Sequence, residues 1–277
     1  MLSNPFAALS DMNILGILVA ALLFGTAMAL TIADDSPLPR ILADVTQSLY
    51  RLAGWVLKAL PVGLFAITYQ LSAQINLDTV AALLQFSAVV LGATLVHGLI
   101  VLPAIAWWVA GIPPWHFLQR IVQPLITALA TSSSAATLPL SMATAEQELK
   151  ASRARSAFVL PLGATANMDG TALFEGIAAV FLAYMFGVEL GTVGIIAVFI
   201  VAMLSSVGAP GMPSGSMAGM QLVLIAAGIP LEAIGLLLLV ERPLDTFRTA
   251  VNVEGDLVGC LVAERFGGVT IAEEQPS

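Results

Sequence analysis

A run of polar residues inside an apolar segment, PLGATANMDGT at residues 161–171, most constrains how this chain can fold. The run contains Asp169, and a charged carboxylate at the centre of a membrane-spanning helix costs about 2.5 to 3.5 kcal/mol. Asp169 therefore needs a nearby cation, hydrogen-bond donors or a water-filled cavity. Gly170, which follows it, permits an unwound turn whose carbonyl oxygens face a ligand. The run predicts a binding site inside a bundle of helices.

The composition indicates a membrane protein. Hydrophobic residues make up 58% of the 277 residues and charged residues only 10%, and the mean hydropathy of +0.95 is far from the balance of soluble domains. Residues 12–33, 59–77 and 79–111 contain no Asp, Glu, Lys or Arg, and each is near or above the roughly 20 residues that span a bilayer. We therefore expect an all-α membrane protein in contact with the lipid bilayer. The net charge of −8 argues against nucleic acid as a partner.

Two later apolar segments are interrupted by polar and turn-forming residues. Residues 115–149 are broken by TSSS at 131–134, and residues 192–227 by GAPGMPSGS at 208–216. Each half is too short to cross a bilayer, so each segment predicts a re-entrant helical hairpin. A helix rich in polar residues follows each hairpin. A unit that occurs twice in this way is typical of an inverted repeat, with the binding site where the broken segments meet.

Polar residues recur along one side of the last predicted helix. Asp245, Arg248, Asn252 and Asp256 follow the spacing i, i+3, i+7 and i+11, so they form one stripe that faces the protein interior. The planar fork of Arg248 suits a carboxylate and Asp245 can accept an ammonium group, so the pair suits an acidic amino acid. Alternatively, Asp245 and Arg248 form a buried ion pair with each other, which the i, i+3 spacing allows.

Four motifs in this order resemble the glutamate/aspartate transporter family, the dicarboxylate/amino acid:cation symporters. They are TSSSAATLP (131–139), PLGATANMDGTAL (161–173), the Gly/Pro/Ser tip (208–216) and LDTFRTAVNVEGD (244–256). The match extends upstream to residues 4–6, so we expect the chain to lack about the first third of a typical member. The resemblance implies an elevator-type transporter core. Its expected parts are scaffold-type helices at 1–75 and a transport-domain core at 76–277, with a helix, a hairpin at 113–150, a broken helix at 152–187, a hairpin at 190–228 and a last helix at 230–266.

The resemblance implies sodium-coupled symport of an acidic amino acid, aspartate or glutamate, or of a C4-dicarboxylate. It implies a transporter and not an enzyme, with sodium ions as coupling ions and no organic cofactor. A homotrimer is expected if the scaffold is complete, and a bacterial inner or cell membrane is the expected location. One alternative is a truncated, non-transporting remnant that keeps only the substrate and sodium sites. Another, an intramembrane aspartyl protease using Asp169 and Asp245, is disfavoured because no water-activating pair motif is present.

The resemblance also implies roles for individual residues. In the family, the residue at Arg248 holds the side-chain carboxylate of the substrate, and the residue at Asp245 holds its amino group. The predicted substrate-binding residues are Ser132, Ser133, Ser134, Thr171, Gly211, Met212, Ser216, Asp245, Arg248, Thr249 and Asn252. For sodium, Gly163, Asn167, Asn252 and Asp256 match one site, Thr165, Met168, Ser206, Val207 and Ala209 match a second, and Asp169 matches a third. Oxygen ligands of this kind suit an alkali cation.

Three further positions carry expectations. Family members usually place another arginine at the first hairpin tip or directly after the aspartate of the last helix, where this chain has Ser132 and Thr246. Asp245 is therefore expected to lack its usual cationic neighbour. Glu175 lies where eukaryotic glutamate transporters carry a glutamate linked to proton coupling, so it is a candidate for proton-coupled symport, unless it only caps a polar pocket. His97, alone in an apolar helix, is expected to be a hydrogen-bonded core residue and not a ligand.

Overall fold

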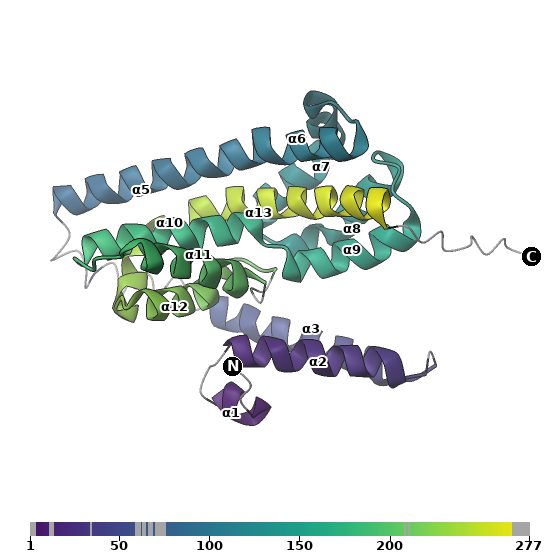
Figure 1. Ribbon diagram of the computed structural model, residues 1–277, viewed down its shortest axis with the longest axis horizontal. Coiled ribbons are helices and arrows are strands. Elements are labelled where there is room, and N and C mark those ends of the chain that lie inside the picture. The colour runs from purple at the N-terminus through teal and green to yellow at the C-terminus, as the bar shows by residue number, and fades with distance from the viewer. Residues whose placement is uncertain are drawn as a thin grey trace, which may run out of the picture. The chain divides into compact units, whose positions relative to one another are not determined.

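The computed structural model describes residues 4–10, 14–33, 35–58, 62, 65, 69, 76–207, 209 and 211–267. Within these residues every regular element is a helix (Figure 1), which confirms the predicted all-α class. The chain divides into two compact units, residues 1–80 and 81–277. The assignment of a scaffold role to residues 1–75 and of a transport role to residues 76–277 stays a prediction.

The first unit contains α1 (Pro5–Ser10), α2 (Ile14–Thr31) and α3 (Leu38–Lys58). Helix α2 ends just before the acidic and proline residues at 34–37, where a helix end is predicted because proline cannot donate a backbone hydrogen bond. The sequence predicts a helix from residue 42 to residue 74. Helix α3 begins at Leu38, four residues earlier, and the part predicted beyond Lys58 lies mostly outside the described residues.

A single long rod opens the second unit. It consists of α5 (Leu77–Val96), the five-residue π-helix η1 (His97–Val101) and α6 (Leu102–Ala110), which continue one another without a break (Figure 1). The rod is 34 residues long and apolar enough to cross a membrane. It ends at Gly111, whose φ of 68° lies in the left-handed region that glycine adopts readily.

Two helical hairpins form where the apolar segments are interrupted. The first pairs α7 (Pro114–Thr131) with α8 (Ser134–Gln147), and the second pairs α11 (Thr192–Ser206) with α12 (Ser216–Ala227). The two helices of each pair pack against each other, which confirms that both interruptions produce hairpins. We call residues 132–133 tip 1 and residues 207–215 tip 2. The re-entrant placement of the hairpins in a membrane stays a prediction.

The segment that carries Asp169 is a broken helix, formed by α9 (Arg153–Ala166) and α10 (Asp169–Met185). The break consists of Asn167 and Met168 and therefore precedes Asp169. The prediction that Gly170 provides an unwound turn is wrong, because Gly170 lies inside the first turn of α10. A Cβ atom at Gly170 would lie 2.8 Å from the carbonyl oxygen of Arg248, so this glycine instead allows a close approach between two helices.

Helix α13 (Ile234–Phe266), which follows the short 3₁₀ helix η2 (Leu231–Ala233), is the central element of the second unit. It packs against α6, α7, α9 and α10, and Figure 1 shows it among them. Every residue from Arg248 to Val258 is buried, so this part of α13 is enclosed on all sides and not only along one face. The polar stripe predicted along the last helix therefore lies in the protein interior.

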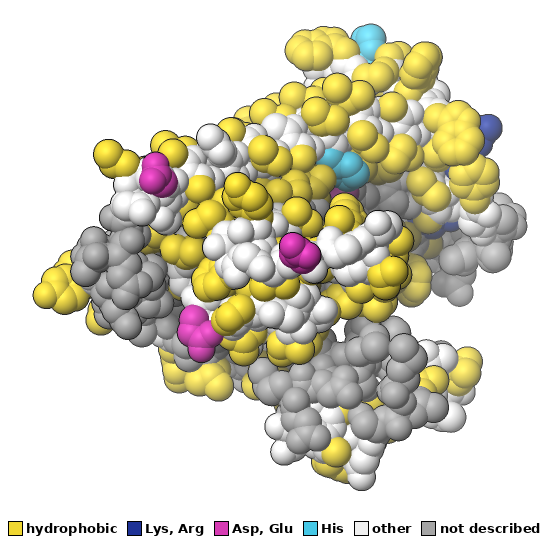
Figure 2. All heavy atoms as spheres, turned by 60° about the vertical axis from the view of Figure 1, so that its left-hand side comes forward, with side chains coloured by type: hydrophobic (Ala, Val, Ile, Leu, Met, Phe, Trp, Pro, Cys, Tyr) yellow, Lys and Arg dark blue, Asp and Glu magenta, His cyan; other side chains and the backbone are white. Residues whose placement is uncertain are grey.

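Large hydrophobic side chains cover much of the outer surface. On the face shown in Figure 2 hydrophobic side chains predominate, and the acidic ones are isolated from one another. Trp107, Trp108 and Trp115, at the end of the rod and the start of α7, are all exposed. Soluble monomers rarely expose apolar surface on this scale, whereas lipid-facing surfaces are apolar and carry tryptophan near the membrane interface.

Candidate functional site

Four segments of the second unit meet at one small cavity. It is lined by tip 1 and the first residue of α8, by the break between α9 and α10, by tip 2 and the first residue of α12, and by the polar stripe of α13. The lining residues are Ser132, Ser134, Met168, Thr171, Gly211, Met212, Gly215, Ser216, Asp245, Thr249 and Asn252. The structure thus brings together every predicted substrate-binding residue except Ser133 and Arg248. The cavity volume is about 10 Å³, room for about one water molecule.

Helix ends supply the electrostatic field of this region. Ser134 and Ser216 are the first residues of α8 and α12, and both line the cavity. Backbone N–H groups at a helix N-terminus carry partial positive charge and favour an anion. Helices α9 and α11 end at Ala166 and Ser206, beside the break and tip 2, and carbonyl groups at a helix C-terminus favour a cation. The same region therefore offers separate places for an anionic group and for cations.

Ser133 lies beside the cavity and joins the two tips. Its hydroxyl accepts a hydrogen bond from the backbone N–H of Ala136 (3.1 Å), which caps the N-terminus of α8. The same hydroxyl donates to the carbonyl oxygen of Gly211 in tip 2 (2.7 Å), which also accepts from the backbone N–H of Ala135 (3.2 Å). The structure thus gives Ser133 partners other than the predicted substrate carboxylate.

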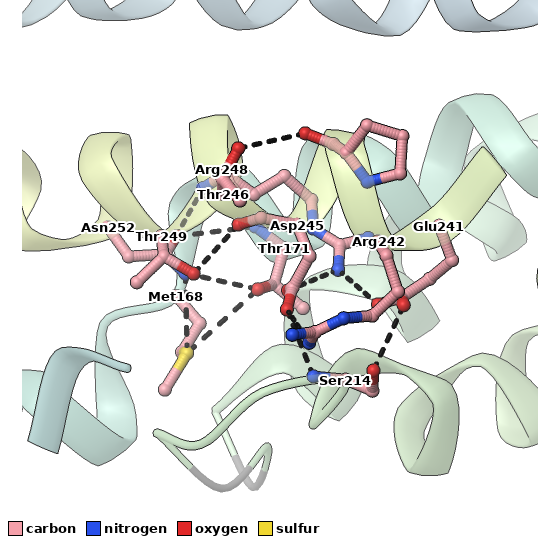
Figure 3. A network of polar contacts seen from close by, with 12 residues as sticks. Met168, Thr171, Ser214, Glu241, Arg242, Asp245, Thr246, Arg248, Thr249 and Asn252 are labelled. Atoms are coloured by element: carbon pink, nitrogen blue, oxygen red, sulfur yellow. Dashed lines mark hydrogen bonds and ion pairs between the residues drawn. The ribbon is translucent and has the colours of Figure 1, made fainter. Parts of the chain in front are cut away.

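The guanidinium group of Arg248 is buried next to the cavity, with only 1% of its side chain exposed. Its Nη2 atom donates to Glu241 Oε1 at 2.9 Å and to Asp245 Oδ1 at 2.6 Å (Figure 3). Its Cζ atom lies over the ring of Phe174, 4.0 Å from the ring centre. Its Nε and Nη1 atoms have no hydrogen-bond partner among the described residues. The Asp245–Arg248 ion pair considered as an alternative is therefore formed. The Nε and Nη1 atoms of Arg248 still have no hydrogen-bond partner among the described residues, so they could bind a ligand.

Asp245 lacks an arginine at the two positions usual in the family, but the structure gives it another cationic neighbour. Besides Arg248, Arg242 places Nη1 3.4 Å from Asp245 Oδ2. Arg242 lies one turn before Asp245 on α13, and its side chain is about half exposed (Figure 3). The family pattern puts the extra arginine at another position, which is why a position-by-position match missed Arg242.

Acidic side chains of α13 also hold tip 2. Asp245 Oδ2 accepts from the backbone N–H of Ser214 (3.0 Å), and Glu241 Oε2 accepts from the hydroxyl of the same serine (3.0 Å) (Figure 3). Sequence reasoning missed both Glu241 and Ser214. Glu241 lies four residues before Asp245 and seven before Arg248, so extending the polar stripe backwards along the helix would have found it.

Asn252 holds the broken helix in place. Its Oδ1 atom accepts from the backbone N–H groups of Gly170 (2.8 Å) and Thr171 (3.3 Å). Its Nδ2 atom donates to Thr171 Oγ1 (3.1 Å) and contacts the sulfur of Met168 (3.4 Å). Because the first N–H groups of a helix have no partner within the helix, Asn252 completes the start of α10 and fixes Thr171 beside the cavity.

The residues predicted for the first sodium site lie together. Asn167 Nδ2 donates to Asp256 Oδ1 at 3.0 Å, and a Cβ atom at Gly163 would lie only 2.5 Å from the same oxygen. Asn252 lies one turn before Asp256 on α13. The end of α9, the break and α13 thus bring one carboxylate and two side-chain amides close together, and oxygen donors of these kinds are ones that an alkali cation prefers.

The residues predicted for the second sodium site share fewer contacts with one another than those of the first. A Cβ atom at Gly211 would lie 2.6 Å from the carbonyl oxygen of Ala164, so tip 2 touches α9 next to Thr165. The hydroxyl groups of Thr165 and Ser206 donate to carbonyl oxygens of their own helices. Met168 lines the cavity, while Val207 and Ala209 lie at the start of tip 2 and share no described hydrogen bond with Thr165.

Asp169, predicted for the third sodium site, is paired with His97. His97 Nε2 lies 2.7 Å from Asp169 Oδ2, and Asp169 Oδ1 accepts from the backbone N–H of Gly170 (3.0 Å). His97 is therefore hydrogen-bonded as predicted, although about a quarter of its side chain is exposed (24%). It is also the first residue of the π-helix η1, and π-helical turns are frequent at functional sites.

Glu175, the candidate for proton coupling, is fully buried. Its Oε2 atom accepts a hydrogen bond from the hydroxyl of Ser205, and its Oε1 atom has no partner among the described residues. A Cβ atom at Gly219 would lie 2.5 Å from Oε1, so this glycine makes room for the carboxyl group between α10 and α12. The ring of the neighbouring residue Phe174 contacts the guanidinium group of Arg248.

Broken helices whose ends surround one polar cavity are typical of the core of a secondary transporter. Comparison with known proteins also indicates a secondary transporter. The family model described as the sodium:dicarboxylate symporter family matches residues 1–266, so the chain belongs to this family. As a member of a family of membrane transporters, it is an integral membrane protein.

Two relatives are similar over most of the chain. The neutral amino acid transporter B(0) of Mus musculus is 38% identical over 251 residues, which are 90% of this chain and 45% of that protein. Excitatory amino acid transporter 1 of Ambystoma tigrinum is 35% identical over 259 residues, which are 93% of this chain and 48% of that protein. The chain therefore spans about half the length of these relatives. Both are animal proteins, so they do not support the expected bacterial location.

Proposed function

We propose that this chain forms the substrate- and sodium-binding core of a sodium-coupled amino acid symporter, and that its substrate is an acidic amino acid, aspartate or glutamate, or a C4-dicarboxylate. The observation that carries the proposal is the buried guanidinium group of Arg248 beside the cavity, with Nε and Nη1 unpartnered among the described residues. A buried guanidinium group with free N–H groups is suited to a carboxylate.

Each charged group of an acidic amino acid has a matching partner. Arg248 would pair with the side-chain carboxylate, and Asp245, which lines the cavity, would accept the ammonium group. The N-terminus of α8 at Ser134 would receive the main-chain carboxylate. Since the cavity volume is only about 10 Å³, substrate binding requires the lining segments to move apart, and we propose that tip 2 is the segment that moves.

The names of the relatives include both excitatory and neutral amino acid transporters, so family membership leaves the substrate class open. Arg248 favours the acidic class, because only an acidic substrate brings a second carboxylate to the Nε and Nη1 atoms, which have no partner among the described residues. We further propose that the hairpins are re-entrant, that transport is an elevator-like motion, and that the complete protein forms a homotrimer.

Sodium coupling is expected from the shared position of Asn252. This residue bonds Thr171 at the cavity and lies one turn before Asp256, where Asn167 and Gly163 complete the proposed cation site. A sodium ion there should strengthen substrate binding by about 1–3 kcal/mol, the usual range for coupled sites. Isothermal titration of the purified chain with aspartate in sodium and in choline buffers measures this coupling. Equal affinities in the two buffers would contradict it.

Replacing Arg248 tests the substrate class directly. Arg248→Cys should weaken aspartate binding by about 2–5 kcal/mol, because the second carboxylate would be buried without a partner. Serine, which has no second carboxylate, should lose much less, so selectivity should move towards neutral amino acids. The matched control is Arg120→Cys, since Arg120 is an exposed arginine on α7. Equal losses for aspartate and serine would show that Arg248 acts through Asp245 and not as the specificity residue.

Measuring aspartate uptake into proteoliposomes that contain this chain distinguishes a transporter from a protein that only binds substrate. Sodium-driven accumulation of aspartate by this chain would support the symporter. Binding without accumulation is the outcome expected of a non-transporting remnant that keeps only the substrate and sodium sites.

A proton-coupled symporter is the second candidate function. The observation in its favour is Glu175, a fully buried carboxyl group with one oxygen that lacks a partner among the described residues. Glu175→Gln would remove the exchangeable proton and keep the shape of the side chain. Aspartate uptake driven by a proton gradient should then be lost, while sodium-dependent binding persists. Proton-driven uptake that survives the substitution would exclude this role.

A further inference from the structure

Arg248 has two acidic partners although it carries one positive charge. Glu241 Oε1 and Asp245 Oδ1 lie 2.9 Å and 2.6 Å from the same nitrogen, Nη2. Both Arg248 and Glu241 are almost fully buried, each with 1% of its side chain exposed, so solvent screens their interaction little. If Asp245 binds the ammonium group of the substrate, Glu241 stays beside Arg248 as a second anion.

This arrangement creates a competition for Arg248. The second carboxylate of an acidic substrate must approach the guanidinium group where the carboxylate of Glu241 already accepts a hydrogen bond from Nη2. Two like charges a few ångströms apart in a buried site repel strongly. A neutral substrate brings no such charge. Glu241 therefore weakens acidic substrates relative to neutral ones, in opposition to Arg248.

We propose that Glu241 is a resident counter-ion of Arg248 and a specificity-determining residue, which competes with the second carboxylate of the substrate and sets the balance between acidic and neutral amino acids. The proposal rests on the proposed function of the same site. Its further support is the second oxygen of Glu241, which holds the hydroxyl of Ser214 in tip 2 at 3.0 Å. The carboxylate of Glu241 thus bridges the guanidinium group and tip 2. A shift of Glu241 away from Arg248 would therefore change its hydrogen bond to Ser214 in tip 2.

The test is Glu241→Gln, which keeps the shape of the side chain and removes its charge. Aspartate and asparagine, which differ in the second carboxylate, are titrated against the wild-type chain and the variant in sodium buffer. The preference for aspartate over asparagine should rise by about tenfold or more in the variant, because the anion that opposes the second carboxylate is gone. Arg248 keeps its bond to Asp245, so it is not left without a partner.

The matched control is Glu232→Gln, an equal loss of charge at an exposed position of η2, nine residues earlier in the sequence. It should leave the preference unchanged. Glu241→Asp is a second variant that keeps the charge and moves it away from Arg248 by one methylene group. It should raise the preference for aspartate less than Glu241→Gln does, and it provides the measurement if the Gln variant does not fold.

The outcomes separate this inference from the proposed function. A wild-type chain that binds neither amino acid in sodium overturns both. A wild-type chain that binds them, with a preference that Glu241→Gln leaves unchanged or lowers, overturns only the role of Glu241. If Glu241→Asp leaves the preference for aspartate over asparagine unchanged, the role of Glu241 is likewise overturned.

Discussion

The two hairpin tips differ in what holds them. Tip 1 is two residues long, and the Ser133 hydroxyl caps α8 directly after it, besides donating to the carbonyl oxygen of Gly211 in tip 2. Tip 2 is nine residues long, and no side-chain cap is formed at the start of α12. It has a few local backbone bonds, such as the one from the N–H of Gly215 to the carbonyl oxygen of Met212, but its side-chain-mediated bonds to α13 run through Ser214 to Glu241 and Asp245. Both tips contain a serine with positive φ, Ser132 at 51° and Ser214 at 61°.

This difference indicates that tip 1 keeps its conformation and that tip 2 can move. A tip that is held by local hydrogen bonds keeps its shape when its surroundings change. A tip that is held by acidic side chains of another helix can be released when those side chains find other partners, and Asp245 is also the proposed partner of the substrate ammonium group. The three following variants test whether tip 2 depends on other segments more than tip 1 does.

The largest effect is expected from Gly211→Ala. The new Cβ atom would lie 2.6 Å from the carbonyl oxygen of Ala164, a backbone atom that cannot move away easily, so tip 2 should be displaced from α9 at a cost of about 1–3 kcal/mol. Hydrogen exchange should become faster at residues 211–216, while the Ala136 amide in the first hairpin stays protected. The control is Gly191→Ala, where an added Cβ atom meets nothing within 4 Å. Unchanged exchange at tip 2 would contradict the close contact.

A smaller effect is expected from Ser133→Ala, which removes the N-cap of α8. Loss of a cap costs about 0.5–2 kcal/mol, so the Ala136 amide should exchange faster. Tip 2 should change little, because the Ala135 amide still donates to Gly211. Ser87→Ala is the control, since the Ser87 hydroxyl donates only to a carbonyl oxygen of its own helix. If the effect were larger at tip 2 than at Ala136, tip 1 would not be locally fixed.

The smallest effect is expected from Ser214→Ala. The variant loses the hydrogen bond to Glu241 but keeps the bond from its backbone N–H to Asp245, so tip 2 should be destabilised by about 0.5–1.5 kcal/mol. Exchange should become faster at tip 2 and stay the same at tip 1. Ser48→Ala, whose hydroxyl bonds only its own helix, serves for comparison. A uniform change at both tips would mean that they open together.

The positions of the breaks could be predicted because they depend on local sequence. Runs of Ser, Gly and Pro inside apolar segments interrupt helices wherever they occur, and the breaks at residues 132–133 and 207–215 follow this rule. The polar stripe of α13 was predictable for a similar reason, since the helical period places Asp245, Arg248, Asn252 and Asp256 on one side. All four are buried.

The contacts between distant segments could not be predicted. Gly170 resembles a helix breaker in the sequence, but its position is decided by the backbone of Arg248, 78 residues later, against which it packs. Arg242 reaches Asp245, and Ser133 reaches Gly211, through side-chain directions that depend on how the helices pack. The predicted roles of the substrate and sodium residues stay predictions, although most of the substrate residues line one cavity.

The enclosed position of α13 has a consequence for how the protein is made. Its central part carries Glu241, Asp245, Arg248, Glu254 and Asp256, and each charge at the centre of an isolated spanning helix opposes membrane insertion by about 2.5–3.5 kcal/mol. The helices that surround α13, from α6 to α10, all precede it in the chain. During synthesis, α13 therefore has to enter a groove that the earlier helices have already built, so it joins the bilayer by docking onto protein and not by partitioning into lipid.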